Sequence, residues 1–406
     1  MDLIIRRARL RGGEGPVDLA ISGGLIGSIA PDLPGQAERE IDAHGGLVTE
    51  SYCNPHLHMC KVYTLQMMDE LALRDYHGGG MGKAMNAIEL ASRVKEKYDA
   101  GWIIENVRRA LDLAVIHGNL HIRAFADVDS KAGLEGVKAL IRARDEYSGL
   151  LELQVVAFPQ DGVIREPGAE ELVREALEMG ADVVGGIPWI EYTEADELEH
   201  IQKMFRLAKE YNRDISMLVD DAGDPTLKTL EKLAIETIRN NWEGRVLAHH
   251  ARAMELYPKP YFQKLAAILK RAQVGVVSDP HTGPLHARVK EMLEEGALVC
   301  LGQDDISDAY YPYGRNNMLE VAFLASHLLW MTGAEDMETL YDMIGSRAGQ
   351  AMGIKEHRVI EGAAANLVVL REDSVLEALR NQEPPAVVIY KGRVVAENSH
   401  SSQIYR

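Results

Sequence analysis

Residues 47–58 read LVTESYCNPHLH. The apolar segment 47–53 predicts a buried β-strand, and His56 and His58 follow at its carboxyl end. Two side chains at positions i and i+2 of an extended backbone point to the same face, so both imidazoles reach one metal ion. Two surface histidines on a loop are the alternative interpretation. The position of the two histidines after the first strand of the predicted barrel favours the metal-ligand interpretation.

Seven further apolar segments predict β-strands, and most of the intervals between them carry helical periodicity, as in residues 170–179 and 198–211. The segments are 120–126, 151–158, 182–187, 215–219, 245–249, 274–278 and 298–302. Eight strands, each followed by a helix, predict an α/β fold of the (β/α)8 TIM-barrel type. Active sites of such barrels lie at the carboxyl ends of the strands, which restricts the search for functional residues.

The two chain ends differ from the middle. Residues 3–48 and 365–395 contain short apolar runs separated by glycine, a pattern typical of β-hairpins. Neither end buries a sheet face alone, so the two are expected to pair. We therefore predict a small β-sandwich domain formed by residues 1–48 and 356–406, and a barrel domain of residues 49–355.

Composition narrows the class of protein. The chain has 406 residues, of which 46% are hydrophobic and 26% charged, and this balance excludes disorder and low complexity. A net charge of -18 disfavours nucleic acid and anionic membranes as partners. The three cysteines do not suggest a disulfide framework, and no secretory signal or membrane span is evident. We expect a cytoplasmic protein with a small-molecule substrate.

The other strand ends carry further candidate groups. Asp304 follows the eighth strand, where a carboxylate can bind a metal ion and accept a proton from water. A helix N-cap is the alternative role for an aspartate in this segment, and it applies to Asp305 or Asp308. Asp221 follows the fifth strand as a proton relay or a solvated acid. His249 and His250 end the sixth strand, and alternation predicts that one of them faces inwards. Gln160, after the third strand, offers both a donor and an acceptor to a substrate amide edge.

One glycine-rich segment is a weaker signal. Residues 78–83 read GGGMGK, which superficially suggests a phosphate-binding loop. No apolar strand precedes it and the Lys-Ser/Thr ending is absent, so we predict a flexible loop near the barrel mouth instead.

Longer stretches of the sequence resemble the amidohydrolase superfamily, and within it the group of cytosine deaminases and N-isopropylammelide isopropylaminohydrolases. The resemblance covers nearly the whole chain. The matching stretches are DAHGGLV (42–48), PHLH (55–58), LQVVAFPQ (153–160), DVVGGIP (182–188), VKEMLEEG (289–296), GQDD (302–305) and NML (317–319). The combination is far more specific than any one of these motifs.

This resemblance implies a function and a set of site residues. It implies metal-dependent hydrolysis of a C–N bond in a small nitrogen heterocycle or cyclic amidine, such as cytosine-like, triazine or creatinine-like compounds, in a homo-oligomeric enzyme. It implies one divalent zinc or iron ion on His56, His58 and Asp304. It further implies catalytic roles for Asp304, His250 and Asp221, and a substrate pocket lined by Gln160, Trp189, Asp305 and Tyr310.

Four positions depart from the family pattern. Leu218 stands where the family has a fourth metal-ligating histidine, and Asp221 replaces a catalytic glutamate. Phe125 replaces a histidine common on strand two, and Cys60 replaces a common aspartate. Three explanations of the metal ligand missing at Leu218 compete.

In the favoured explanation the metal stays on three ligands, with water completing its coordination. In the second, His249, His281 or Cys60 swings in as a ligand. In the third, the metal is weak or absent and the chemistry has changed. The corresponding alternative functions are release of an alkylamine or opening of a cyclic amide, and non-catalytic binding on an amidohydrolase scaffold.

Overall fold

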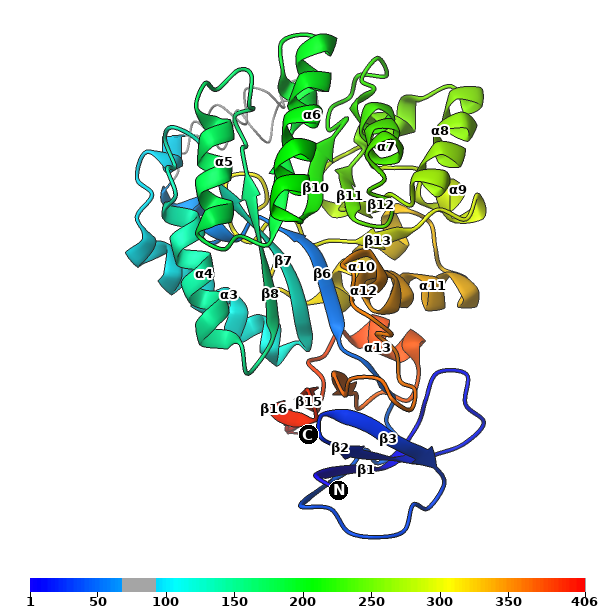
Figure 1. The fold of residues 1–406 in the computed structure, drawn as a ribbon. Helices are drawn as coiled ribbons and strands as arrows, with labels where there is room; N and C mark the ends of the chain where they lie inside the picture. The colour runs from blue at the N-terminus through cyan, green and yellow to red at the C-terminus, as the bar shows by residue number, and fades with distance from the viewer. Residues whose placement is uncertain (68–92, 406) are drawn as a thin grey trace.

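The computed structural model describes residues 1–67 and 93–405. Eight parallel strands form one sheet in which each strand pairs with the next along the chain (Figure 1). They are β6 (Tyr52–Leu57), β7 (Asn119–Asp127), β8 (Glu152–Phe158), β9 (Val183–Gly186), β10 (Asp214–Val219), β11 (Val246–His250), β12 (Gly275–Ser278) and β13 (Val299–Leu301). The predicted (β/α)8 barrel is confirmed. The glycine-rich segment 78–83 lies outside the described residues.

The barrel closes at the two segments that carry the predicted metal ligands. The backbone N–H of Asp304 donates to the His56 carbonyl oxygen at 2.9 Å, and the N–H of His58 donates to the Asp304 carbonyl oxygen at 2.8 Å. These bonds form a parallel bridge between β6 and the chain just beyond β13. The backbone therefore fixes the separation of the first and last strand ends.

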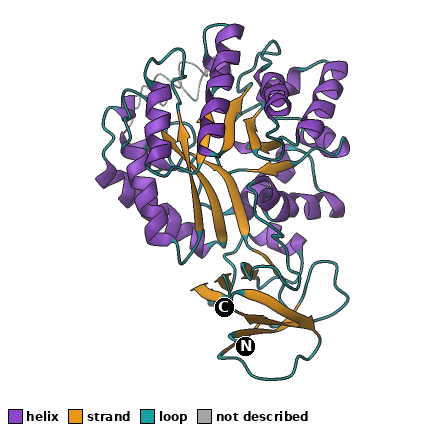
Figure 2. Ribbon diagram, in the orientation of Figure 1, coloured by secondary structure: helices purple, strands orange, loops and turns teal. Residues whose placement is uncertain are grey.

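Helices surround the strands (Figure 2). They are α3 (Ala100–Ile116), α4 (Glu135–Tyr147), α5 (Ala169–Glu178), α6 (Glu194–Tyr211), α7 (Thr229–Asn240), α8 (Lys259–Ala272), α9 (Val289–Glu294), α10 (Met318–Leu328), α11 (Ala334–Ile344), α12 (Ser346–Ala351) and α13 (Val375–Asn381). In α6, the Thr193 side chain accepts from the Asp196 N–H at the start, and Asn212 ends the helix in the left-handed conformation. Its apolar face, including Ile201 and Phe205, is buried against the barrel as the periodicity predicts.

The predicted bounds of the first barrel strand were wrong. Residues 47–53 divide into β5 (Val48–Glu50), which pairs with β14 (Leu367–Val369), and the start of β6. Both strands are buried on both faces, and the polar residues Thr49, Glu50 and Ser51 lie at the break, which the prediction of one continuous strand did not take into account. As a result, His56 lies within β6 and not in the loop after it.

The chain ends form two four-stranded sheets beside the barrel, and both termini lie on that side (Figure 1). One sheet contains β1 (Leu3–Ala8), β2 (Val17–Ser22), β3 (Leu25–Ala30) and β4 (Arg39–Asp42); the other contains β5, β14, β15 (Val387–Tyr390) and β16 (Arg393–Glu397). Ile5, Leu19, Leu367 and Ile389 share the apolar core between them. β5 spans the predicted limit at residue 48, and the division into two domains stays a prediction.

No helix among the described residues is long and apolar enough to span a lipid bilayer.

Candidate active site

The structure brings the three predicted metal ligands together at the carboxyl ends of β6 and β13. The Oδ1 atom of Asp304 lies 3.0 Å from His56 Nε2 and 3.8 Å from His58 Nε2. Each residue offers one ligand atom, and these atoms lie within 4.8 Å of one another. All three side chains are buried, so water competes little for them.

The protonation states of this cluster suit metal binding. Burial acts to raise the pKa of Asp304, but the His250 charge and the His56 hydrogen bond hold that pKa well below its usual value. Burial, with the charges of Lys61 and His56, lowers the pKa of His58 well below its usual value. A carboxylate and a neutral imidazole are the forms that coordinate divalent cations. This set of donors therefore fits zinc or ferrous iron.

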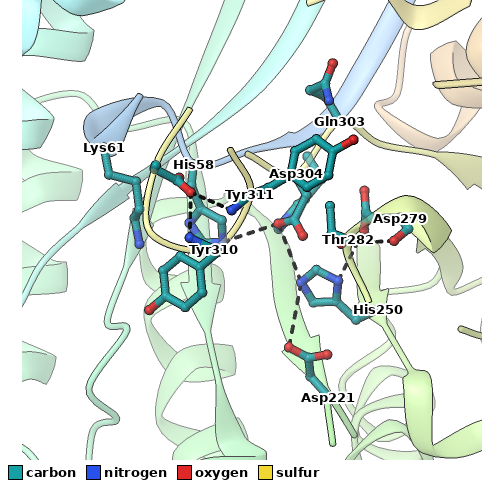
Figure 3. Close-up of polar contacts among 12 residues, drawn as sticks. His58, Lys61, Asp221, His250, Asp279, Thr282, Gln303, Asp304, Tyr310 and Tyr311 are labelled. Carbon is teal, nitrogen blue, oxygen red and sulfur yellow. Dashed lines mark hydrogen bonds and ion pairs between the residues drawn. The ribbon is translucent and has the colours of Figure 1, made fainter. Parts of the chain in front are cut away.

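His250 lies between three carboxylates (Figure 3). Its Nδ1 atom is 3.3 Å from Asp279 Oδ2, and its Nε2 atom is 3.9 Å from Asp304 Oδ1 and 4.0 Å from Asp221 Oδ2. Burial acts to lower the pKa of His250, but the charges of Asp221 and Asp304 raise it overall. Asp279 was not predicted as a site residue, although it directly follows the predicted strand 274–278 and so carried the same signal as Asp304.

A buried arginine joins two of these acids. Arg252 forms an ion pair with Asp221 Oδ1, and its Nη2 atom lies 3.7 Å from Asp304 Oδ2. The same Nη2 atom donates to Thr282 Oγ1 at 2.5 Å. Asp221 therefore forms an ion pair with the Arg252 guanidinium and also faces His250. Arg252 was not predicted as a site residue, because it lies after β11 in a segment where no periodicity distinguishes it.

The prediction that one histidine of the pair at the end of β11 faces away was wrong. The His249 ring lies 4.5 Å from the His56 ring, and the His250 ring lies 4.9 Å from it, measured between centroids. His250 and Ala251 have φ angles of 67° and 50°, so the chain leaves the extended conformation at His250. Strand alternation no longer applies there, and both imidazoles adjoin His56.

A second polar group surrounds Gln160. The Lys61 ammonium donates to Gln160 Oε1, and its Nζ atom is 3.3 Å from Asp127 Oδ2. Gln160 Nε2 in turn donates to the Tyr310 hydroxyl at 3.1 Å. Burial acts to lower the pKa of Lys61, but Asp127 raises it overall, so Lys61 remains a cation. Gln160 and Tyr310 are thus brought together, and Lys61 and Asp127 join them although neither was predicted from the sequence.

The remaining predicted pocket residues lie in different surroundings. Trp189 packs in an apolar cluster with Phe125, Phe158 and Leu218. The Phe125 ring lies 4.5 Å from the His56 ring, so this cluster forms an apolar wall beside the histidines. Asp305 is buried, and burial together with the charge of Asp304 raises its pKa well above the usual value. A protonated Asp305 is a hydrogen-bond donor as well as an acceptor.

Two of the suggested replacement ligands are already engaged. The Cys60 sulfur accepts from the Asp127 N–H at 3.3 Å, and burial raises the pKa of its thiol to about 12. His281 Nε2 donates to the Gln303 carbonyl oxygen at 3.1 Å. Neither side chain belongs to the His56–His58–Asp304 cluster.

The fold and the site define a barrel enzyme with a buried histidine–aspartate centre at the carboxyl ends of its strands. Residues 39–396 match the model of the amidohydrolase family, to which the chain belongs. The family resemblance inferred from the sequence is confirmed: the chain is an amidohydrolase-superfamily hydrolase of carbon–nitrogen bonds.

Relatives extend over the whole chain. N-isopropylammelide isopropyl amidohydrolase of Pseudomonas sp. (strain ADP) is 31% identical over 401 residues, which are 98% of each chain. The structure of 5-methylcytosine deaminase from Klebsiella pneumoniae, liganded with phosphonocytosine, aligns with a TM-score of 0.90 and 28% identity over 99% of this chain and 100% of that one. N-isopropylammelide isopropylaminohydrolase from Burkholderia multivorans ATCC 17616 has a TM-score of 0.87 and 24% identity over 98% and 99% of the chains.

Proposed function

We propose that this amidohydrolase is a metal-dependent deaminase that removes an amino group from a small nitrogen heterocycle or cyclic amidine. The observation that carries the proposal is the buried cluster of His56, His58 and Asp304, with His250 Nε2 3.9 Å from Asp304 Oδ1. The 28% identical structural relative is a deaminase of a pyrimidine, which supports a ring substrate.

His56, His58 and Asp304 would hold one zinc or ferrous ion. Such an ion, when bound, lowers the pKa of a water molecule from about 15.7 towards about 7. Asp304, which its lowered pKa keeps ionised, would accept a proton from the attacking water. His250 donates a hydrogen bond to the oxygen that adds to the ring carbon and stabilises the charge that develops there.

The remaining residues orient the ring and move the proton. The proton that Asp304 accepts would pass by way of His250 to Asp221, which would deliver it to the leaving nitrogen, so that the ring carbon gains the oxygen of water and loses ammonia. Gln160 would hold the substrate through the second N–H of Nε2, because Lys61 bonds to Oε1 and the Tyr310 hydroxyl accepts the first N–H. Tyr310, Trp189 and Asp305 would complete the pocket.

The test combines metal analysis with a substrate screen. About one equivalent of zinc or iron per chain is expected by plasma emission. Pyrimidines, amino-triazines and creatinine-like rings are then incubated with the metal-loaded protein, and ammonia is measured. Ammonia release from a ring amine that stops on metal removal and returns with Zn²⁺ or Fe²⁺ supports the proposal. A metal-loaded protein that releases no ammonia from any ring class contradicts it.

A second candidate reaction is release of an alkylamine from the same kind of ring. The 31% identical relative is an N-isopropylammelide isopropyl amidohydrolase, a name that contains an N-alkylated substrate, and this observation favours the second reaction. The screen separates the two reactions when N-alkylated and unsubstituted amino-triazines are compared and both ammonia and alkylamine are assayed. Opening of a cyclic amide would be seen as a new carboxylate without either product.

A further inference from the structure

Gln160, the residue expected to bind the ring, follows β8 at the same end of the barrel as the candidate metal ligands. Its backbone N–H donates to the Phe158 carbonyl oxygen at 3.0 Å, and the Phe158 ring lies 5.4 Å from the His58 ring, measured between centroids. A carboxamide offers an acceptor on one side and two donors on the other. The orientation of the Gln160 amide therefore decides which substrate groups it can bind.

Lys61 determines that orientation. Its ammonium donates to Gln160 Oε1, and its Nζ atom lies 3.3 Å from Asp127 Oδ2. A lysine ammonium has three N–H donors and no acceptor, so the Gln160 nitrogen cannot take the place of the oxygen beside it. The orientation of the amide thus follows from the chemistry of the two groups in contact.

The position of Lys61 is itself fixed by its surroundings. Lys61 ends the short 3-10 helix η1 (Met59–Lys61) after β6, and its backbone N–H donates to the His58 carbonyl oxygen at 3.3 Å. Its Nζ atom lies 5.3 Å from the centroid of the Tyr310 ring, and Lys61 is only 6% exposed (Figure 3). These contacts hold the ammonium in place between Asp127 and Tyr310.

The Nε2 atom of Gln160 is the part of the amide that remains for a substrate. One of its two N–H groups donates to the Tyr310 hydroxyl at 3.1 Å, and the second has no acceptor among the residues that the structure describes. An oxo oxygen of the ring can accept this N–H. An amino group in the same place would bring two donors together and leave both unsatisfied in a buried site.

We propose that Lys61 is a positioning residue that sets the ring selectivity of the enzyme through Gln160. By binding Oε1, Lys61 turns the N–H groups of Gln160 to the substrate. The enzyme therefore selects rings with an oxo group facing Gln160 over rings with an amino group there. This inference rests on the proposed function and deepens it, because it narrows the substrate class to heterocycles that carry both an amino and an oxo group.

The test compares matched rings on the metal-loaded protein: cytosine with 2,4-diaminopyrimidine, and ammelide with melamine. In each pair, amino groups replace the oxo groups of the first ring. Wild type should favour the oxo ring in kcat/KM by about tenfold or more, chiefly through KM. Titration calorimetry with the corresponding product rings measures the preference without turnover. If the substrate screen identifies another ring, its oxo and amino forms are compared in the same way.

Three variants separate the role of Lys61 from a structural one. Lys61→Met keeps the length of the side chain but frees the amide to turn, so the preference for the oxo ring should fall by about tenfold or more, mostly through KM. Lys61→Arg keeps a donor and should retain most of the preference. Gln160→Glu, whose carboxylate only accepts, should favour the amino ring. Lys355→Met, at an exposed position, is the control and should change nothing.

Thermal unfolding checks the fold of each variant. Lys61→Met leaves the buried Asp127 carboxylate without this cation, and an unpaired buried charge is destabilising. If Lys61→Met fails to fold, the double variant Lys61→Met/Asp127→Asn removes both charges and replaces it, with the same expected loss of preference.

The outcomes separate this inference from the function on which it rests. A wild-type protein that favours the amino ring overturns the inference. So does a Lys61→Met protein in which both rings lose activity equally and the preference is unchanged. In either case a ring is still deaminated, and the proposed function stands. A metal-loaded wild-type protein that releases no ammonia from any ring overturns the proposed function and this inference with it.

Discussion

Asp304 and His250 have φ angles of 65° and 67°, in the left-handed region that few non-glycine residues adopt. Such a conformation costs on the order of 1–3 kcal/mol and persists where the surrounding structure holds it. At His250 it ends the strand geometry, so that His249 and His250 both adjoin His56. At Asp304 it accompanies the backbone bonds to β6 that place the carboxylate 3.0 Å from His56 Nε2.

Replacement of Asp304 by asparagine should abolish turnover and leave the fold intact. The amide keeps the shape of the side chain but neither binds a cation as a carboxylate does nor accepts the proton of water. We expect kcat to fall by about 10³-fold or more, measured on the substrate that the screen identifies. Asp373→Asn, at an exposed position, is the control. Activity retained in Asp304→Asn would reject this residue as the base.

Asp279→Asn tests the orientation of His250. The Asp279 carboxylate faces His250 Nδ1 at 3.3 Å and favours a proton on that nitrogen. An asparagine amide can instead donate to Nδ1 and stabilise the other tautomer. We expect kcat to fall by roughly 10²–10⁴-fold with little change in KM. A rise in KM with unchanged kcat would show that Asp279 acts on substrate binding instead.

At the scale of elements, the site depends on how closely the end of β13 packs against its neighbours. A Cβ atom on Gly302 would lie 2.4 Å from Asp279 Oδ1 and 2.8 Å from His56 Cβ. The close approach brings the residues after β12 and β13 against β6, where the barrel closes. Gly302 thus lets three strand ends approach one cation site, an effect that hydrophobic periodicity does not reveal.

Gly302→Ala should therefore damage the site and the barrel together. Its methyl group would displace Asp279 or His56, and we expect a loss of about 1–3 kcal/mol in the free energy of unfolding. Zn²⁺ affinity should fall as well, measured by chelator competition alongside denaturant unfolding. Gly149→Ala is the control, because no atom lies within 4 Å of the Cβ that it adds. Unchanged stability and affinity in Gly302→Ala would contradict this account of the packing.

At the scale of the whole molecule, a buried histidine joins the chain ends to the barrel. His357 Nε2 donates to the carbonyl oxygen of Ser51, the residue between β5 and β6, at 2.7 Å. Burial, and then the charge of His121, lowers the pKa of His357 to about 3 from a usual 6.5. Folding therefore holds this imidazole neutral at the junction between the end sheets and the barrel.

Stability should fall with acidification in the corresponding window. Between pH 6.5 and about pH 3 the unfolded chain binds a proton on His357 and the folded chain does not. The contribution of the neutral His357 to the free energy of unfolding is therefore fully present above pH 6.5. It decreases as the pH falls, by up to about 1.4 kcal/mol per pH unit. Denaturant unfolding between pH 7 and pH 4 measures it. His357→Gln should show a shallower decline, and an equal decline would assign the acid sensitivity to other groups.

The sequence alone determined the class of fold, because buried parallel strands are apolar runs and the helices between them are amphipathic, and both patterns are local. It also indicated His56, His58, Asp221, His250 and Asp304, since each is a polar residue in or next to such a run. Asp279 carried the same signal and was overlooked.

Only the tertiary structure determined the strand boundaries and the contacts between residues that are distant in the sequence. The break between β5 and β6 depends on which sheet each strand joins, and the inward placement of His249 depends on a backbone turn at its neighbour. The role of Arg252 depends on two acids from different strand ends. Contacts between residues distant in the chain arise only when the barrel closes, because closure alone brings β6, β11 and β13 within reach of one another.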